Sequence, residues 1–294
     1  MGTKSNTTRM VASIIITTWN RPELLKRALK SARSQTFKDY EVIVVDDCSD
    51  IPVEGAIRHE VNKGLSAARN TGIKVAKGKY VVFLDDDNEL MPEFLSQTVP
   101  ILEAKHFVDS IEQQLDAVAV GRTIQYKDFT DYVVPKTDLL SSIDWGWLVK
   151  REVFDSIRYT EHLRANEDTD FGIQFFKRFK AIQLDEPLTI AHDSEDPKQS
   201  LSFPTKRELE GMLNFYAKNR HEYKNSKEIW CLQRLMGRKF YRGGYKLQGL
   251  RYFWWGFKAY PAIRSFLHLF FLLFGWTIYD KFMTAEEKLA AKLR

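Results

Sequence analysis

Three consecutive carboxylates, Asp85, Asp86 and Asp87, follow an apolar run over residues 80–84 that predicts a buried strand. Buried carboxylates without partners are costly, so a fold that places three at a strand end is expected to supply a cation or strong hydrogen-bond donors. Carboxylate oxygens suit Mn²⁺ or Mg²⁺, which often keep coordination positions for waters and substrate phosphates. Taken alone, a solvated acidic turn closed by Asn88 explains the triplet equally well.

The segments before this strand predict alternating strands and helices. Residues 11–16 form a continuous apolar run, typical of a central parallel strand, and residues 41–45 predict a second strand. Between them, an apolar stripe at helical spacing follows Pro22, and Asn20 is the expected helix cap. Residues 64–76 predict a second helix, which precedes the strand that carries the carboxylates.

This alternation predicts an α/β fold with a mostly parallel central sheet, right-handed crossovers and flanking helices. The second strand also ends in acidic residues, Asp46 and Asp47. Because ligands of such sheets bind outside the carboxyl ends of the strands, both acidic clusters are expected at one binding edge. A further helix over residues 92–104 and a strand near residues 115–120 are predicted beyond them.

A third acidic group, Glu167 and Asp168, precedes an apolar helical stripe. Acidic residues at a helix start are favoured by the helix dipole, so simple capping is one interpretation. Two short strands, at residues 181–184 and 188–191, are predicted to end at His192. A single histidine in a loop is more often structural than a ligand.

The composition is that of an ordinary globular protein of 294 residues, with a net charge of +5. Cys48 and Cys231 match no metal-binding spacing, and free thiols in a reducing compartment are expected. The first residues do not resemble a secretory signal. The charge is unevenly spread: residues 205–294 contain 18 Lys and Arg against seven Asp and Glu, so a mildly acidic body carries a basic tail. A domain over residues 1–204 and an extension over 205–294 are therefore predicted.

The extension opens with a capping box, Thr205 to Glu208, and is rich in aromatic residues: 16 of the 39 in the chain lie within residues 238–282. Its most apolar segment, residues 265–278, is shorter than the roughly 20 residues that span a bilayer. Basic residues beside Trp and Phe favour helices that lie on an anionic membrane surface. Packing against the first domain, or oligomerisation through these helices, is the alternative. No nucleic-acid motif accompanies the basic residues, so nucleic acid is not expected as a partner.

Taken together, residues 11–202 resemble the family 2 glycosyltransferases, which have the Rossmann-like GT-A fold. The resemblance rests on five motifs that occur in the family's order and at its intervals. These are residues 13–21 (SIIITTWNR), 44–50 (VVDDCSD), 62–72 (NKGLSAARNTG), 83–87 (FLDDD) and 166–168 (NED).

The resemblance implies a nucleotide-sugar donor, with UDP as the expected nucleotide. Asp47 corresponds to the carboxylate that binds the base, and the same pocket would be lined by Thr17 or Thr18 and by Arg21. Arg69 would lie near the nucleotide and its diphosphate, where a guanidinium suits anionic oxygens.

Residues 85–87 correspond to the DXD motif of the family. Asp85 or Asp86 would hold the ribose, and Asp87, together with Asp85, would bind Mn²⁺ or Mg²⁺. The family usually has a small residue at the middle position, whereas this chain has Asp86, so the division between ribose and metal stays open. His192 resembles the histidine that completes the metal site in some members.

Asp168 corresponds to the catalytic base that takes the proton of the acceptor hydroxyl, with Glu167 as a neighbouring support. Trp145 and Gly146 fall where the family often contacts the acceptor sugar. Attack opposite the leaving group would invert the anomeric configuration.

The sequence therefore predicts a metal-dependent inverting glycosyltransferase of cell-surface polysaccharide synthesis, peripheral on the inner, cytoplasmic face of the cell membrane. Its basic tail suggests a lipid-linked saccharide acceptor, such as a polyprenyl-diphosphate oligosaccharide. A catalytically inactive, membrane-associated nucleotide-sugar-binding adaptor is the alternative. A nucleotidyltransferase is disfavoured because residues 17–22 contain no glycine, and a receiver domain is disfavoured by the length of the chain.

Overall fold

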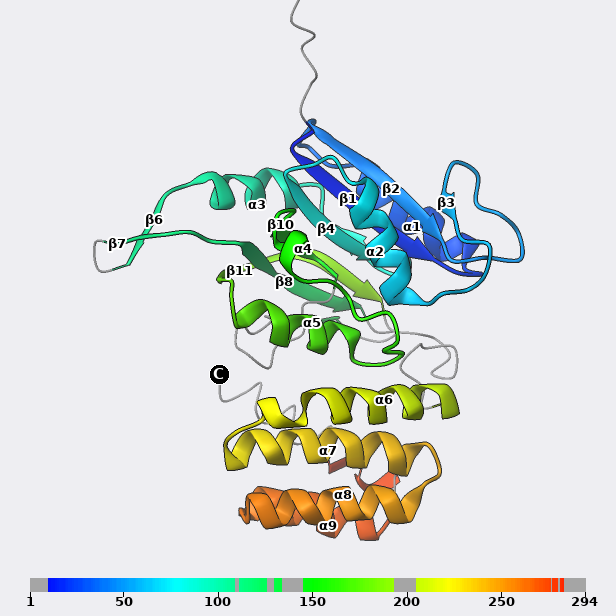
Figure 1. Cartoon of the computed structure of the whole chain (residues 1–294), viewed down its shortest axis with the longest axis vertical. Coiled ribbons are helices and arrows are strands. Elements are labelled where there is room, and N and C mark those ends of the chain that lie inside the picture. Colours follow the sequence, from blue (N-terminus) through cyan, green and yellow to red (C-terminus); the bar gives the residue numbers. More distant parts are fainter. Residues whose placement is uncertain are drawn as a thin grey trace, which may run out of the picture. The chain divides into compact units, whose positions relative to one another are not determined.

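The computed structural model describes residues 10–108, 111–125, 130–133, 145–192, 205–275, 277–279 and 281–282. The chain divides into two compact units (Figure 1). The first comprises residues 1–162 and 166–195, and the second comprises residues 163–165 and 196–294. The domain boundary predicted between residues 204 and 205 falls at the edge of a stretch outside the described residues.

The first unit is built around strand β1 (Ala12–Thr18), whose seven residues are all buried. It pairs in parallel with β2 (Tyr40–Asp46) on one side and with β4 (Tyr80–Asp85) on the other. In this register Thr17 lies beside Asp85, and Thr18 lies beside Asp46. The carboxyl ends of the three strands therefore bring together the two acidic clusters that the sequence analysis singled out.

The chain reverses its direction across the sheet at β1, because the strand order is β3-β2-β1-β4, where β3 is Ile57–Arg58. Right-handed crossovers in opposite directions place α1 (Pro22–Arg33) and α2 (Leu65–Val75) on opposite faces. The crevice at such a reversal is the usual ligand site of an open α/β sheet. The fold thus positions the ends of β1 and β4 for binding.

Glycine at position 72 allows the close approach of α2 to β1. A Cβ atom at Gly72 would lie 2.4 Å from Cγ2 of Ile15, a distance that would force one element to move. Helix α1 differs from prediction at its start, since Arg21 rather than Asn20 is the N-cap residue. Asn20 instead has a left-handed φ of 55° and accepts a hydrogen bond from the backbone N–H of Asp50.

The other half of the sheet is mixed rather than mostly parallel. Beyond β4 come β10 (Trp147–Lys150), β8 (Ala117–Gln125), β11 (Ala181–His192) and β5 (Glu89–Leu90), with β9 (Thr130–Val133) beside β8. Of these neighbouring pairs, only β8 and β11 are parallel. Strand β11 is one continuous strand in place of the two short strands predicted for its residues, and the register of its pairing with β8 shifts between Leu184 and Thr189. A separate hairpin joins β6 (His106–Val108) and β7 (Ile111–Gln113).

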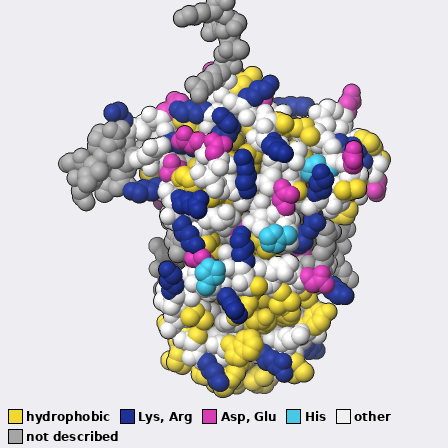
Figure 2. Space-filling model, viewed as in Figure 1, with side chains coloured by type: hydrophobic (Ala, Val, Ile, Leu, Met, Phe, Trp, Pro, Cys, Tyr) yellow, Lys and Arg dark blue, Asp and Glu magenta, His cyan; other side chains and the backbone are white. Residues whose placement is uncertain are grey.

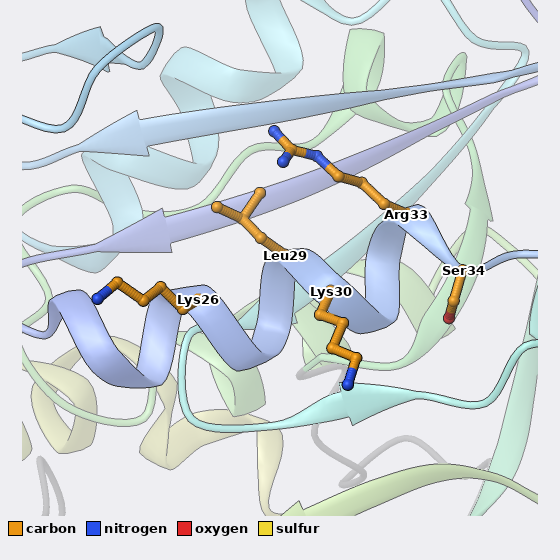
Figure 3. A pocket seen from close by; sticks show the side chains of 5 residues that line it. All are labelled: Lys26, Leu29, Lys30, Arg33 and Ser34. Carbon is orange, nitrogen blue, oxygen red and sulfur yellow. The ribbon is translucent and has the colours of Figure 1, made fainter.

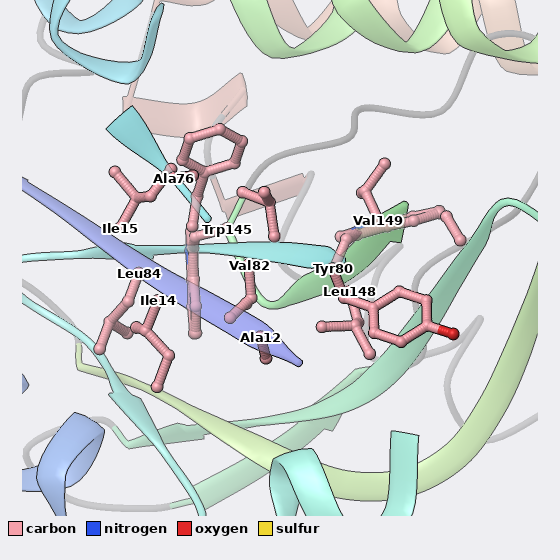
Figure 4. Close-up of a cluster of buried hydrophobic side chains, with 14 of the residues drawn as sticks. Ala12, Ile14, Ile15, Ala76, Tyr80, Val82, Leu84, Trp145, Leu148 and Val149 are labelled. Carbon is pink, nitrogen blue, oxygen red and sulfur yellow. The ribbon is translucent and has the colours of Figure 1, made fainter. Parts of the chain in front are cut away.

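The core of the first unit lies on both faces of this sheet (Figure 4). The labelled side chains come from β1, β4, β10 and the segments beside them. Helices α3 (Phe94–Glu103), α4 (Val153–Ser156) and α5 (Glu167–Phe176) supply further apolar side chains. Tyr159 lies edge-on to Phe83 of β4 and stacks on Phe171 of α5, with ring centroids 5.3 and 4.5 Å apart. These ring contacts of Tyr159 hold helix α5 close to the end of β4.

The second unit consists, in its described residues, of helices: α6 (Lys206–Asn219), a short 3₁₀ turn (Arg220–Glu222), α7 (Ser226–Arg242), α8 (Lys246–Ala259) and α9 (Ile263–Leu273). The capping box predicted at Thr205 and Glu208 is present, and Asn225 and Glu228 form a second one at α7. No helix in the described part of the chain has the length and apolar character needed to cross a bilayer.

Candidate functional site

The three carboxylates after β4 have different surroundings. Asp85 is directed toward Arg69, whose Nη2 lies 2.9 Å from its Oδ1. Asp86 is buried and accepts hydrogen bonds from Thr18 Oγ1 at 2.7 Å and Arg21 Nη1 at 3.1 Å. The same Arg21 nitrogen lies 3.1 Å from Oδ2 of Asp87. The side chain of Asp86 is 7% exposed, against 29% for Asp85 and 39% for Asp87, so the two outer carboxylates are the more accessible.

These carboxylates carry more negative charge than their cations offset. Burial raises the pKa of Asp86 to about 6, although Arg21 and Thr18 favour its ionised form. Burial and the neighbouring charge of Asp85 raise the pKa of Asp87 against the effect of Arg21. Accessible carboxylates that repel one another are the oxygen donors that Mn²⁺ or Mg²⁺ would stabilise, so the chemistry of Asp85 and Asp87 fits a divalent cation.

His192, at the end of β11, contacts Glu89 of β5 and the neighbouring Asn88. Its Nε2 is 2.7 Å from Oε1 of Glu89, and its backbone N–H donates to Oδ1 of Asn88 at 3.3 Å. Among the described residues, no three His, Cys, Asp or Glu side chains gather closely enough to hold a metal ion. The predicted role of His192 as a metal ligand alongside Asp85 and Asp87 stays a prediction, because a histidine that contacts a carboxylate through one ring nitrogen can still bind a metal through the other.

Arg69 connects the carboxylates after β4 to helix α5. Its guanidinium is buried, lies 5.5 and 5.1 Å from the ring centroids of Phe83 and Tyr159, and approaches Oε1 of Glu167 to 3.8 Å through Nη1. Neither Nε nor Nη1 has a hydrogen-bond partner. Burial opposes the charge of Arg69, but Asp85, Tyr159 and Glu167 raise its pKa, so it stays a cation. The charge of a buried cation can favour an anionic group bound nearby.

The residues after Arg69 in the same motif explain how this cation is held. Asn70 donates through Nδ2 to the backbone oxygen of Tyr159 at 2.9 Å and accepts from the backbone N–H of Tyr159 at 3.2 Å. This pair of hydrogen bonds fixes the ring that lies against Arg69. The next two residues have structural roles. Thr71 contacts His59, and Gly72 allows α2 to pack closely against β1.

Glu167 and Asp168 lie in the first turn of α5, after Asn166 in a left-handed conformation with φ 57°. Burial and the adjacent charge of Asp168 raise the pKa of Glu167 to about 7, against the effect of Arg69. Oδ1 of Asp168 accepts a hydrogen bond from the backbone N–H of Thr169 at 2.7 Å. Near neutral pH, Glu167 can therefore hold a proton beside Asp168.

The acidic pair after β2 divides into two roles. Asp46 accepts from the backbone N–H groups of Ser49 and Val53 and pairs with Arg58, so it stabilises its own loop. Asp47 follows β2, and its carboxylate reaches the residues just before α2. It accepts hydrogen bonds from the backbone N–H groups of residues 63 and 64 at 2.8 and 2.6 Å. His59 Nδ1 lies 2.7 Å from Oδ1 of Asp47, and its Nε2 lies 2.8 Å from Oγ1 of Thr71.

The remaining predicted residues are largely enclosed. Thr17 is buried in β1. Trp145 is 5% exposed and lies in the core, with the guanidinium of Arg122 4.2 Å from its ring centroid. Gly146 has a positive φ of 77°, and a Cβ atom there would meet Thr189 at 2.9 Å. Trp145 therefore packs inside the protein, and Gly146 serves the backbone turn before β10.

A hollow of about 420 Å³ runs along α1 (Figure 3). It is lined by Lys26, Leu29, Lys30, Arg33 and Ser34. None of these residues belongs to the predicted site.

Three contributing residues escaped the sequence analysis. Arg27 donates through Nη2 to the backbone oxygen of Asp87 at 2.6 Å, and its Nε lies 3.8 Å from Oε1 of Glu89. His59 orients Asp47, and Tyr159 covers Arg69. Arg27 lies in the helix that directly follows β1, and its basic side chain was the one available signal. Nothing in the local sequence marks His59 or Tyr159.

Comparisons with known proteins identify the family and the fold. Residues 13–158 match the sequence profile described as Glycosyl transferase family 2. A putative colanic acid biosynthesis glycosyl transferase, WcaA of Escherichia coli (strain K12), is 27% identical over 75% of this chain and 85% of its own. A GalNAc(5)-diNAcBac-PP-undecaprenol beta-1,3-glucosyltransferase of Campylobacter jejuni is 36% identical over 53% of this chain and 57% of its own.

Two solved structures have the same fold. Residues 1–349 of TarS from S. aureus, in complex with UDP-GlcNAc, match with a TM-score of 0.61 and 18% identity, over 96% of this chain and 92% of that one. The mannosyltransferase PcManGT of Pyrobaculum calidifontis, in complex with GDP-Man and Mn²⁺, matches with a TM-score of 0.56 and 17% identity, over 97% and 86%. Together with the five motifs and the GT-A fold of the first unit, these matches establish that the chain belongs to glycosyl transferase family 2 and is a glycosyltransferase.

Proposed function

We propose that this glycosyltransferase moves a sugar from a UDP-sugar to a hydroxyl of a saccharide acceptor, with inversion at the anomeric carbon and with help from a divalent cation. The observation that carries the proposal is the position of Arg69. This buried cation contacts Asp85, at the end of β4, and approaches Glu167, in the first turn of α5. The donor side and the acceptor side of the reaction would meet at this side chain.

The donor would bind across the carboxyl ends of β1, β2 and β4. Asp47 keeps a carboxylate oxygen, Oδ2, that receives one backbone hydrogen bond and can accept another from a ring N–H of the base. Asp85 is better placed than Asp86 for the ribose hydroxyls, because Asp86 is buried and occupied by Thr18 and Arg21. The buried charge of Arg69 would attract the diphosphate through space. UDP is favoured because the TarS neighbour holds UDP-GlcNAc, although another neighbour holds GDP-Man.

Asp85 and Asp87 would hold the divalent cation, which when bound neutralises the diphosphate leaving group. Arg21 would keep Asp87 in place through their ion pair while also binding Asp86. His192, whose Nε2 lies 2.7 Å from Oε1 of Glu89, is not required as a ligand in this arrangement. The Mn²⁺ in the mannosyltransferase neighbour supports the proposed choice of metal.

Asp168 would act as the general base. Its carboxylate would take the proton of the acceptor hydroxyl as that oxygen attacks the anomeric carbon from the side opposite the diphosphate, which inverts the configuration. Glu167, with its raised pKa, would carry a proton below about pH 7 and a negative charge above it. The charge on Glu167 would make Asp168 a stronger base, so the two residues would work as a pair.

The acceptor would be a lipid-linked saccharide used in cell-surface polysaccharide synthesis. The name of the Campylobacter jejuni relative specifies an undecaprenol-linked saccharide, and the Escherichia coli relative is named for colanic acid biosynthesis. A lipid-linked acceptor would place the enzyme as a peripheral protein at the inner face of the membrane.

A thermal-shift panel of nucleotide sugars, with Mn²⁺ or with a chelator, tests the donor and the metal together. We expect one UDP-sugar to stabilise the protein only when metal is present. Stabilisation by a GDP-sugar alone, or an equal effect in chelator, would contradict the proposed donor or the proposed metal.

The base is tested by Asp168→Asn, with Asp155→Asn, an exposed aspartate of α4, as the matched control. The first variant is expected to bind donor normally while kcat falls at least a hundredfold, the lower range of a general base's contribution. The control is expected to match the wild type. Near-normal turnover of Asp168→Asn would exclude it as the base.

A further inference from the structure

Helix α9 exposes apolar residues where a helix that faces water would expose polar ones. Its buried side includes the polar residues Ser265 and His268. Among the α9 residues whose side chains the structure describes, the exposed ones are apolar and follow a spacing of three, four and three along the helix, so they share one face. These are Ile263, Phe266, Phe270 and Leu273, followed directly by Phe274.

The buried polar residues have partners, so their inward orientation is consistent with stable packing. Oγ of Ser265 donates to the backbone oxygen of Tyr260 at 2.5 Å. Nδ1 of His268 lies 3.0 Å from the hydroxyl of Tyr279. Because a buried polar group is tolerated when it is hydrogen-bonded, these contacts allow Ser265 and His268 to lie inward beside Leu272, while the apolar residues listed above lie outward.

Helix α8 adds apolar and basic residues to this surface. Leu247, Arg251, Trp254 and Lys258 are all exposed and lie on one side of the helix, at spacings of four, three and four. Nζ of Lys258 lies 5.3 Å from the ring centroid of Trp254. A basic side chain beside an aromatic ring is the arrangement found where a protein surface meets lipid head groups.

The two helices form one continuous surface. Ring contacts run from Trp254 to Phe257 on α8, to Phe266 and Phe270 on α9, and on to Phe274, with centroids 5.0–6.3 Å apart. We call this surface, with Leu247, Arg251, Lys258, Ile263 and Leu273, the aromatic face. Of the 16 large hydrophobic residues exposed in the described part of the chain, ten lie within residues 245–278. Figure 2 shows hydrophobic side chains gathered over the lower part of the view, with Lys and Arg side chains among them.

We propose that the aromatic face docks on an anionic lipid surface, with its rings among the head groups and its cations at the phosphates. Exposed apolar surface of this extent marks an interaction site, and an amphipathic helix with basic and aromatic residues is suited to a membrane interface. Residues 245–279 contain four Lys and Arg and no acidic residue. A symmetric contact with a second copy would bring these cations together, so charge favours lipid over self-association.

The test is flotation of the full chain with vesicles of phosphatidylcholine, alone or mixed with phosphatidylglycerol. We expect binding to the mixed vesicles, weakened by salt, together with a blue shift of tryptophan emission and quenching by brominated lipid. Phe266→Ser combined with Phe270→Ser is expected to weaken partitioning roughly tenfold or more, because two half-exposed rings would no longer be buried. Arg251→Glu combined with Lys258→Glu is expected to remove the preference for anionic vesicles.

Ile263→Ser and Ile51→Ser form a matched pair, since both isoleucines are 81% exposed but only Ile263 lies on the aromatic face. Ile263→Ser should weaken vesicle binding, and Ile51→Ser should not. Circular dichroism checks that each variant is folded. Equal binding of all variants, or absence of binding by the wild type, would overturn the proposal. Self-association that the Phe266 and Phe270 substitutions abolish, without vesicle binding, would assign the face to a second copy.

This inference does not depend on the proposed donor or acceptor. Vesicle binding is measured without substrate, and turnover is measured with a soluble acceptor. A failure of either measurement therefore leaves the other informative.

Discussion

Replacement of Asp86 by Asn should stabilise the first unit at neutral pH while it impairs binding of the donor. Asp86 is a buried carboxylate whose hydrogen bonds, from Thr18 and Arg21, do not fully offset its removal from water. Asn keeps an oxygen that can accept from Thr18 but has no charge to desolvate. The change therefore separates the cost of the charge from the contribution of the hydrogen bond.

The size of the effect follows from the pKa of Asp86, about 6 in the folded protein against an ordinary value of 3.8. A carboxyl whose pKa is raised on folding contributes its full stability below the ordinary pKa, and that contribution is lost as the pH rises through the folded pKa. A difference of roughly two pH units corresponds to about 3 kcal/mol over the whole range. Between about pH 4.5 and about pH 7.5, the advantage of Asp86→Asn over wild type should grow by about 2 kcal/mol.

Hydrogen exchange of peptides that cover β4, residues 80–85, measures this change in the first unit without a contribution from the second. The difference in stability between Asp86→Asn and wild type is measured at two pH values. The substitution also removes the charged partner of Arg21, but the part of this effect that does not depend on pH cancels when the two differences are subtracted. We also expect the KM for donor to rise roughly tenfold, because Arg21 loses one of its two charged anchors.

Asp155→Asn is the control, since that aspartate is exposed and should change neither quantity. An advantage of Asp86→Asn that is the same at both pH values would refute the assigned charge cost. A wild-type KM would refute the role of Asp86 in positioning Arg21.

Three further changes test other parts of the site. Asp87→Ala should abolish metal-dependent binding of UDP in calorimetry with Mn²⁺, because the accessible carboxylate beside Asp85 is lost; unchanged binding would move the metal elsewhere. Glu167→Gln should remove the rise in kcat that we expect in wild type as the pH passes through about 7, and a preserved rise would exclude Glu167 as its source. Gly72→Ala should lower the free energy of unfolding by about 1–3 kcal/mol in urea titrations, because its Cβ would overlap Ile15; Ile15→Ala in the same chain should recover part of that loss.

The sequence predicted the half of the fold that local patterns determine. Continuous apolar runs marked β1 and β4, and alternation with helices implied parallel pairing, which the register of Thr17 beside Asp85 bears out. The capping box at Thr205 predicted the start of α6, because both of its hydrogen bonds lie within four residues. A structural feature can therefore be predicted from the sequence where it depends on neighbouring residues or on the handedness of strand–helix–strand crossovers.

The mixed half of the sheet could not be predicted in this way. Strand β10 pairs antiparallel between β4 and β8, a choice made by contacts between segments far apart in the chain. The same limit applies to the contact between His192 and Glu89, which depends on the pairing of β11 with β5. Asn20 has a side chain that can cap a helix, but it forms hydrogen bonds with the loop at residues 49–50 instead of capping α1.

The acids of the site share one property that no sequence pattern reveals. Asp86, Asp87 and Glu167 all have raised pKa values, each with burial as the largest cause. All three therefore reduce stability as the pH rises toward neutrality, although cations lie beside each of them. A fold optimised for stability alone would not gather uncompensated carboxylates at one edge of a sheet. The presence of these carboxylates is explained if the ligand brings a positive charge, such as a divalent cation, to the site. Binding would then relieve the electrostatic repulsion that destabilises the free protein.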